Sequence, residues 1–372
     1  MNRDLIFMAL ALFTWGVGEG AYYIFQPIYL KELGASPIEI GTILGTVGIA
    51  MGAAHIPAGY LSDRVGRRVM MWASWILGLL SAWLMALAGS LPIFVTGMVI
   101  YGITAFVMTP MNSYVTAASG KLSAGRALTM ISAAYNLGAF TGPFIGGYIG
   151  DHFGLQKTYL FAASIFVVSN ILIFNLRPQP VLPREPGTVK ILLQNRAYWA
   201  YLGIILIVFF ALYLPQPLTP NFMQDIHGLS YSAVGLAGSA GSLGNVVINL
   251  VFGSLNPHLG FLIGQITMAL AAFVFWQATG LPWFMLAYFL MGGYRLARAM
   301  AIAQIRTVIN PVNMGLAFGI TETFSSFSLI LVPPIAGIIY TWQPAAIYPI
   351  AILLTGFAIL ISVRFSPRPY HD

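Results

Sequence analysis

Long apolar stretches recur along the whole chain, and the short segments between them hold most of the charged residues. A stretch of about 20 apolar residues is long enough to cross the hydrocarbon core of a bilayer as a helix. Inside that core every backbone amide needs a partner within the protein, so only helices or a closed barrel can span it. The continuous apolar runs favour helices.

The composition also indicates a membrane protein. Only 7% of the 372 residues are charged and 58% are hydrophobic, whereas soluble domains carry roughly 25% charged residues. Such a surface cannot be solvated by water, so the lipid bilayer is the expected solvent. We predict an all-α membrane protein with twelve transmembrane helices, at residues 5–30, 37–62, 69–89, 91–118, 124–150, 156–176, 198–222, 230–256, 259–279, 282–308, 314–340 and 345–363.

Lys and Arg are distributed unevenly among the predicted loops. If the N-terminus is cytoplasmic, thirteen of the 17 Lys and Arg residues fall in cytoplasmic segments, two in outer loops and two within a span. Cytoplasmic loops retain an excess of these residues, so we expect a multi-pass protein of the cytoplasmic membrane with both termini inside. The formal net charge of +7 follows from this topology. No basic face with interleaved aromatic residues indicates a nucleic-acid partner.

Several absences narrow the expected chemistry. The chain has no cysteine, and its five His residues are scattered without the spacing of metal ligands. No G-x-x-x-x-G-K-S/T loop is present, so hydrolysis of a nucleotide by this chain is not the expected energy source. We therefore expect no metal, no cofactor and no enzymatic activity.

A charged segment, residues 59–68, joins the second and third predicted spans. It resembles the loop between helices 2 and 3 of the major facilitator superfamily, whose pattern G-x-L-x-D-R-x-G-R-R/K it fills at every position. The resemblance implies two bundles that open alternately to each side of the membrane, with this motif as a cytoplasmic gate. The simpler alternative is that its cations only follow the positive-inside rule. The gate residues so implied are Gly59, Asp63, Arg64, Gly66, Arg67 and Arg68.

The fifth predicted span contains a second motif. Glycines four residues apart lie on one helical face and allow another backbone to approach, while Pro143 removes a hydrogen bond and bends the helix. The motif resembles the pattern G-x-x-x-G-P-x-x-G-G of antiporters in the same superfamily, which implies exchange of a proton for a small molecule. A packing seam without that function is the alternative. The motif residues are Gly138, Gly142, Pro143, Gly146 and Gly147.

The chain resembles itself in its two halves, which flank a proline-rich, charged stretch. We expect an N-terminal six-helix bundle at 1–176, a cytoplasmic linker at 177–197 and a C-terminal six-helix bundle at 198–372. Parallel repeats of this kind occur in the superfamily, with the substrate site between the halves near the midplane. Aligned positions include Gly41 with Gly235, Pro143 with Pro333, and Gly147 with Gly337.

Four charged residues lie deep inside predicted spans, away from the span ends, where a charge costs about 2.5–3.5 kcal/mol on insertion scales and marks a candidate site. Glu19, in the first span, is the candidate proton carrier; a protonated glutamate with a purely structural bond is the alternative. Arg295 and Arg298 lie three residues apart on one face. Glu322 lies at a depth comparable to that of Arg298, so we predict an ion pair that is either structural or exchanges partners during transport.

Polar and aromatic residues near these charges complete the candidate site. In the superfamily, helices 1, 4, 7 and 10 line the cavity, which implies a lining role for residues of the first and seventh spans. The lining candidates are Gln26, Gln216, Tyr22 and Tyr23.

We expect a secondary transporter that moves a small organic molecule by alternating access, as a proton-coupled exporter and a monomer. Met98 stands where many antiporters of the family carry an Arg, so Arg295 or Arg298 would supply the cation. The same two arginines favour the alternative of a symporter or uniporter for a sugar or an organic anion. A membrane enzyme or a non-transporting sensor is a more distant alternative, because no nucleophile–base pair supports it.

Overall fold

The structure of the protein, a computed structural model, describes residues 2–120, 122–179, 194–305, 309 and 314–367; the side chains of residues 55–63, 109, 314–316, 318, 319 and 322 are outside this description. Every regular element of the described residues is a helix. Ten helical segments among them are long and apolar enough to cross a membrane. The prediction of an all-α membrane protein is confirmed for this part of the chain, while the count of twelve spans stays a prediction.

The chain divides into two compact units. Unit 1 comprises Met1–Ala35, Thr46–Arg184 and Leu229–Ser239, and unit 2 comprises Ser36–Gly45, Glu185–Gly228 and Ala240–Asp372. Most of the predicted linker lies outside the described residues, so the predicted bundle boundaries stay a prediction.

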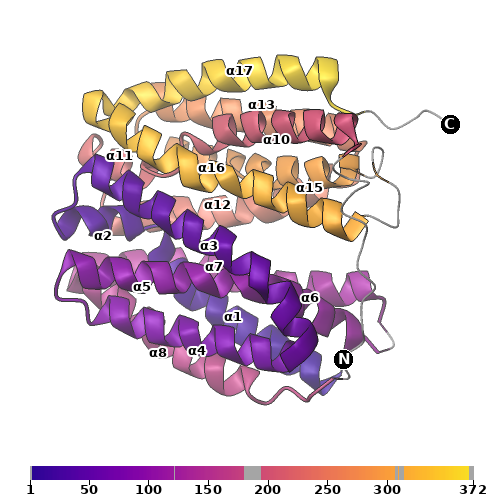
Figure 1. Cartoon of the computed structure of the whole chain (residues 1–372). Helices are drawn as coiled ribbons and strands as arrows, with labels where there is room; N and C mark the ends of the chain where they lie inside the picture. Colours follow the sequence, from indigo (N-terminus) through magenta and orange to yellow (C-terminus); the bar gives the residue numbers. More distant parts are fainter. Residues whose placement is uncertain (1, 121, 180–193, 306–308, 310–313, 368–372) are drawn as a thin grey trace. The chain divides into compact units, whose positions relative to one another are not determined.

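Unit 1 contains eight helical elements of its own among the described residues: α1 (Arg3–Tyr23), α2 (Gln26–Glu32), α4 (Arg67–Ala86), α5 (Leu91–Ile103), η1 (Thr104–Val107), α6 (Met108–Ala117), α7 (Ala124–Phe153) and α8 (Leu155–Ile173). Helix α1 packs mainly against α7 and α8, and α4 packs against α8 and α5 (Figure 1).

Unit 2 contains a corresponding set in its described part: α10 (Arg196–Tyr213), α11 (Thr219–Asp225), α13 (Pro257–Gln277), α14 (Leu281–Leu290), α15 (Gly293–Ile305), α16 (Met314–Trp342), η3 (Pro344–Ala346) and α17 (Ile347–Phe365). Helix α10 packs against α16 and α17, and α13 packs against α17 and α14. The order of partners along the chain is the same as in unit 1.

Two helices belong to both units. Helix α3 (Pro37–Val65) begins in unit 2 and continues in unit 1 from Thr46 onward. Helix α12 (Tyr231–Phe252) begins in unit 1 and continues in unit 2 from Ala240 onward. Each unit therefore holds the first turns of a helix whose remainder belongs to the other unit.

Four predicted spans are interrupted rather than continuous. They are the first, fourth, seventh and tenth, which became α1–α2, α5–η1–α6, α10–α11 and α14–α15. Proline explains two of the interruptions, because it has no N–H to donate and its ring clashes with the carbonyl four residues earlier. Pro27 lies at the start of α2, and Pro215 and Pro217 lie between α10 and α11.

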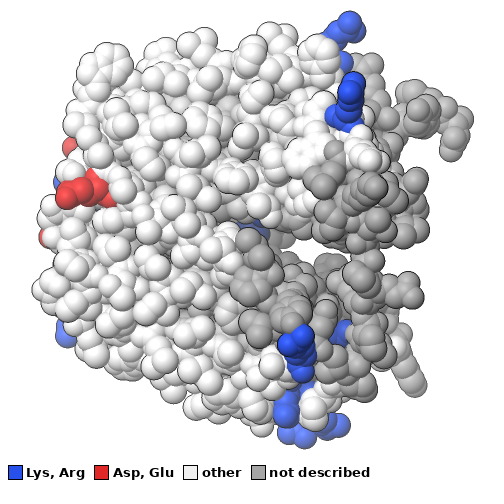
Figure 2. Space-filling view, in the orientation of Figure 1, with Lys and Arg blue, Asp and Glu red and all other residues white. Residues whose placement is uncertain are grey.

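Charged side chains separate to the two ends of the helices. Most of the visible Lys and Arg lie at the right of Figure 2 and a few at the left, where the visible Asp and Glu also lie. In unit 1, the right-hand end is also where α1 begins (Figure 1). Lys and Arg are retained on the cytoplasmic side of membranes, and the orientation with both termini inside stays a prediction.

Candidate functional site

Glu19 contacts α7. The carboxylate is half-buried in the last turns of α1. The Tyr135 hydroxyl of α7 donates a 2.9 Å hydrogen bond to Glu19 Oε2. The predicted proton carrier is thus bonded to the helix that carries the antiporter-like motif. The sequence did not point to Tyr135, because only the register between α1 and α7 brings it to Glu19.

The motif glycines explain why α1 and α7 lie so close together. A Cβ atom at Gly138, Gly142 or Gly146 would lie 2.2, 2.5 or 1.9 Å from a carbonyl oxygen of α1. These distances are far below van der Waals contact, so only glycine fits. The three positions lie on the same helical face as Tyr135, three, seven and eleven residues further on. The glycine face therefore sets the approach that allows Tyr135 to reach Glu19.

The remaining motif residues form a second contact, with the beginning of α12. A Cβ atom at Gly147 would lie 2.5 Å from the Tyr231 carbonyl oxygen, and one at Gly235 would lie 2.2 Å from the Pro143 carbonyl oxygen. The motif thus has two faces, one toward α1 and one toward α12. The packing role predicted for the motif is observed on both.

Unit 2 contains the equivalent contact. A Cβ atom at Gly337 of α16 would lie 2.4 Å from the Pro37 carbonyl oxygen, and one at Gly41 would lie 2.2 Å from the Pro333 carbonyl oxygen. These are the positions that the sequence repeat aligns with Gly147, Gly235 and Pro143. The internal repeat is therefore visible as two matching backbone contacts.

The aromatic candidates of α1 have different environments. Tyr22 is fully buried, and its ring centroid lies 5.8 Å from that of Tyr101 and 5.2 Å from that of Tyr159. Tyr23 is 54% exposed. Gln26 is buried at the first position of α2. Tyr22 is thus part of an aromatic core beside the Glu19 turn, whereas Tyr23 is the accessible residue of the pair.

The candidates of unit 2 lie on α15 and between α10 and α11. Arg295 is exposed and Arg298 is half-buried, both on α15. The Gln216 side chain donates a 3.0 Å hydrogen bond to the Leu212 carbonyl oxygen of α10. The side chain of Glu322 is outside the described residues, so its ion pair with Arg298 stays a prediction.

The non-helical part of the gate motif is shorter than the sequence suggested. Helix α3 extends to Val65 and α4 begins at Arg67, so Gly66 alone connects them, with a φ of 89° that favours glycine. Arg67 Nη1 donates to the Ser113 carbonyl oxygen at 3.4 Å, and Arg68 Nη1 donates to the Leu176 carbonyl oxygen at 3.4 Å. Arg64 is exposed.

The Arg68 bond reaches a carbonyl group just beyond a helix C-terminus, where a positive charge is favourable, and the Arg67 bond reaches the middle of a helix. Leu176 follows the end of α8, and Ser113 lies in α6. The side chains of Asp63 and the other motif residues from 59 to 62 are outside the described residues, so the role of Asp63 as a latch stays a prediction.

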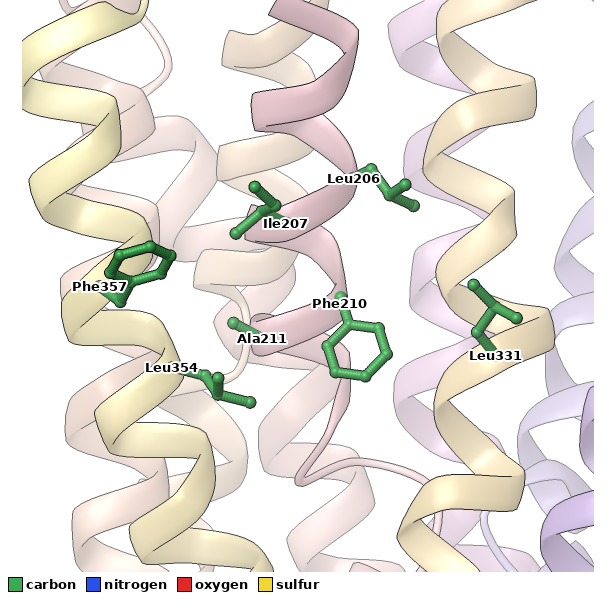
Figure 3. A pocket seen from close by; sticks show the side chains of 7 residues that line it. All are labelled: Leu206, Ile207, Phe210, Ala211, Leu331, Leu354 and Phe357. Atoms are coloured by element: carbon green, nitrogen blue, oxygen red, sulfur yellow. The ribbon is translucent and has the colours of Figure 1, made fainter.

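A cavity of about 240 Å³ lies in unit 2 between α10, α16 and α17 (Figure 3). Its lining has no polar side chain and contains none of the predicted site residues. Leu331 is 46% exposed and Phe357 is 55% exposed at its edge. Ligand sites for polar molecules include a few placed polar groups, so this cavity does not qualify as the substrate site. The lining residues are Leu206, Ile207, Phe210, Ala211, Leu331, Leu354 and Phe357.

Comparison with known proteins identifies the family. The family model described as Major Facilitator Superfamily matches residues 8–260 and 201–372. The chain belongs to the major facilitator superfamily. This transporter family accounts for the helical architecture, the two-unit division and the charged segment at residues 59–68.

Curated relatives come from the same superfamily. Quinolone resistance protein NorA of Staphylococcus aureus is 21% identical over 376 residues, which cover 97% of this chain and 96% of NorA. The uncharacterized MFS-type transporter MJ1560 of Methanocaldococcus jannaschii is 27% identical over 173 residues, 46% of this chain and 45% of that protein. Multidrug resistance protein MdtG of Escherichia fergusonii is 27% identical over 193 residues, 50% of this chain and 47% of MdtG. The chain matches about half the length of the last two relatives.

Solved structures with the same fold include transporters of several kinds. The nucleoside transporter NupG superposes with a TM-score of 0.80 at 13% identity, covering 98% of both chains. The D-xylose-proton symporter superposes with a TM-score of 0.73 at 16% identity, also covering 98% of both chains. At these identities the likeness concerns the fold alone. The protein is therefore a superfamily transporter, and its own residues must indicate what it moves.

Proposed function

We propose that this transporter exports a small organic molecule across the cytoplasmic membrane in exchange for protons, with Glu19 as the proton carrier. The observation that carries the proposal is the hydrogen bond from Tyr135 of α7 to Glu19 of α1. It links an ionisable group at membrane depth, which is a functional candidate by default, to the helix with the antiporter-like motif.

The mechanism follows from competition for one carboxylate. When Glu19 is ionised, it attracts a cationic or hydrogen-bonding group of the substrate; when it is protonated, that attraction is lost. Proton and substrate therefore bind in alternation, which is the requirement for exchange. The Tyr135 hydroxyl can donate to the ionised carboxylate, so α7 is in direct contact with the group that changes charge.

The names of two relatives support export of drug-like molecules. NorA is a quinolone resistance protein and MdtG a multidrug resistance protein, and NorA matches nearly the whole chain. We further propose that the ends of the helices with clustered Lys and Arg face the cytoplasm, and that the linker at 177–197 joins two six-helix bundles on that side.

A second candidate function rests on α15. Arg295 is exposed on α15, within the tenth predicted span, where a cation is costly unless it has a ligand, a partner or a water-filled cavity. An anionic substrate would supply that ligand. This observation favours uptake of an organic anion by symport or uniport.

Everted membrane vesicles distinguish the two. Their lumen corresponds to the outside of the cell, and respiration acidifies it. Export by antiport moves norfloxacin, a fluorescent quinolone, into the lumen and protons out of it. Adding norfloxacin should therefore raise the luminal pH in vesicles with the wild-type protein. Glu19→Gln should abolish this rise, and Glu39→Gln, at an exposed glutamate at the start of α3, should preserve it.

Two results would count against the proposal. Proton movement in the same direction as the substrate would indicate symport. An unchanged luminal response in Glu19→Gln would exclude Glu19 as the carrier. A response to organic anions that is lost in Arg295→Gln would favour the second candidate.

A further inference from the structure

The first backbone N–H groups of α12 are bonded to a side chain of another helix. Tyr231 N–H donates to Asp151 Oδ1 at 2.8 Å, and Ser232 N–H donates to Asp151 Oδ2 at 2.9 Å. The first four N–H groups of any helix lack partners within the helix, and the helix dipole favours a negative charge there. Asp151, at the end of α7, thus caps α12 with both oxygens of its carboxylate.

A second carboxylate binds the same turn. The Tyr231 hydroxyl donates a hydrogen bond to Glu32 at the end of α2. Together with the backbone contacts of Gly147 and Gly235, these bonds attach the beginning of α12 to α7 and α2. All of these contacts lie within unit 1.

The corresponding helix of the repeat, α3, is capped differently. Ser36 N–H and the Ser36 hydroxyl both donate to Glu39 Oε2 at 2.8 Å, and Glu39 N–H donates to the Ser36 hydroxyl at 3.3 Å. This is a capping box made by the helix's own residues. Glycine contacts with α16 hold the beginning of α3 in unit 2, but its N-terminus has a cap of its own.

We propose that Asp151 is a positioning residue for transport: its carboxylate holds the first turns of α12 on unit 1, and the transport cycle requires these bonds to open and re-form. The argument is topological. Helix α12 continues into unit 2 after Ser239, so any motion of unit 2 as a body relative to unit 1 must either carry the first turns away from Asp151 or strain the helix. The proposal rests on membership of the transporter superfamily and is independent of the direction and coupling proposed above.

The charges around Asp151 are consistent with a bond between an ionised carboxylate and a helix N-terminus. Partial burial raises the pKa of the Asp151 carboxyl, but hydrogen bonds with Ser232, Tyr231 and Ser230 outweigh it and lower the pKa below its usual value. The titratable groups of the surrounding elements are Glu32 and Lys31 in α2, Tyr231 in α12, His152 beside it in α7 and Lys157 in α8.

The absence of cysteine from the chain makes a thiol reporter straightforward. Ser239 is 6% exposed in the part of α12 that belongs to unit 1, and its hydroxyl has no hydrogen-bond partner among the described residues. A thiol therefore fits there without loss of a bond. Ser328 of α16 is a matched control in unit 2, since it is 0% exposed and its hydroxyl likewise lacks a described partner.

The experiment measures the labelling rate of Ser239→Cys in full-length protein in membranes with a charged, water-soluble methanethiosulfonate. An N-cap side chain is worth about a 2- to 30-fold change in an equilibrium. Asp151→Ala should raise the labelling rate of Ser239→Cys by a factor in that range, while Ser328→Cys labelling stays unchanged. Asp151→Asn should give a smaller rise, because its amide oxygen accepts one N–H without a charge. The maximal transport rate should change more than KM.

Asp225→Ala is the control for loss of a carboxylate elsewhere, since Asp225 of α11 accepts a 2.9 Å hydrogen bond from Tyr340 in unit 2. It should leave Ser239→Cys labelling unchanged. Equal rises at Ser239 and Ser328, or no rise in either Asp151 variant, would overturn the proposal. If Asp151→Ala does not reach the membrane, the nearly isosteric Asp151→Asn decides by the same comparison.

Discussion

Gly41 in α3 and Gly235 in α12 have equivalent partners: a Cβ atom at either would lie 2.2 Å from a proline carbonyl oxygen, that of Pro333 for Gly41 and that of Pro143 for Gly235. The proline lies in a long helix of the same unit, α16 or α7. Each contact therefore joins the beginning of a shared helix to a long helix with a proline in its interior.

The close approach predicts the effect of a single methyl group. Gly235→Ala should lower the free energy of unfolding by about 1–3 kcal/mol, because the proline carbonyl of α7 has to move to accommodate the Cβ atom. Thermal unfolding in detergent, followed by intrinsic fluorescence, measures this. Gly203→Ala in α10 is the matched control, since nothing lies within 4 Å of a Cβ atom there; equal unfolding temperatures for the two variants would contradict the packing argument.

The Tyr135–Glu19 bond predicts a change in the pH dependence of transport. Tyr135→Phe removes one hydrogen bond to a carboxylate, which is worth about 1.5–3 kcal/mol. The pH at which norfloxacin transport is half-maximal should shift to the alkaline side by about one to two units, since 1.36 kcal/mol corresponds to one unit. Tyr201→Phe, at a buried tyrosine whose hydroxyl donates to the Ala301 carbonyl oxygen, should leave the pH profile in place. Identical profiles for wild type and Tyr135→Phe would remove Tyr135 from the coupling step.

Arg68 predicts a local stability effect in the gate motif. Its guanidinium lies 4.4 Å from the centroid of the Trp72 ring and donates to the Leu176 carbonyl oxygen. Arg68→Ala should destabilise unit 1 by about 1 kcal/mol, and Arg68→Lys should recover part of the loss because the charge remains. Thermal unfolding of the three proteins tests this order. A lysine variant as unstable as the alanine variant would mean that the planar guanidinium, not its charge, is what matters.

The attachment of α12 should resist mild acid. Asp151 has a lowered pKa, so the stabilisation it supplies is complete above the ordinary aspartate pKa of about 3.9 and is lost only as the pH falls through the lower value of the attached state. Because a methanethiosulfonate reacts with the thiolate, every labelling rate falls with pH, so the measured quantity is the rate of Ser239→Cys relative to that of Ser328→Cys. This ratio should stay constant between about pH 8 and pH 5 and rise below about pH 4. Asp151→Asn should remove the acid-dependent rise. A rise in labelling near pH 6 would mean that a group other than Asp151 controls the attachment of α12.

Burial raises the pKa of Glu32, and the Tyr231 hydrogen bond lowers it by less. The pKa shift of Glu32 is therefore opposite in sign to that of Asp151. Burial in the attached state favours the protonated form of Glu32. A neutral carboxyl group still accepts a hydrogen bond, so protonation of Glu32 does not release Tyr231. Glu32 should therefore not cause loosening on acidification, and Glu32→Gln should leave the labelling profile of Ser239→Cys without a new acid-dependent rise.

The sequence predicted the all-helical fold and the aligned positions of the repeat, but not where the helices are interrupted. Glycines such as Gly147 and Gly337 are visible in the sequence because a missing side chain at a fixed spacing has one common cause, the close approach of a second backbone. The interruptions at Pro27 and Pro215 are not part of the prediction. The spans were predicted from apolar runs, and an apolar run does not show where a backbone hydrogen bond is missing. The predicted loop at residues 59–68 reduced to Gly66 for the same reason: charges do not end a helix, but a positive φ does.

The sequence predicted single residues of the candidate site but not the hydrogen bonds between them. Glu19 stands out as a charge within an apolar run, but its partner Tyr135 is one of 18 tyrosines in the chain and depends on the register between two helices. Asp151 is one residue beyond the predicted end of the fifth span, where an aspartate is unremarkable. Its partners are backbone N–H groups, which no sequence motif specifies.

The exchange of helix beginnings between the units has a consequence for biosynthesis. The ribosome completes the first half of the chain long before it synthesises residues 231–239. The face of α7 that carries Gly147 therefore lacks its packing partner until α12 is made. The reverse holds for the face of α16 at Gly337, whose partner at Pro37 is synthesised first. Halves of this protein produced as separate polypeptides would each lack a piece of their own packing, and co-expression should rescue them where separate expression does not.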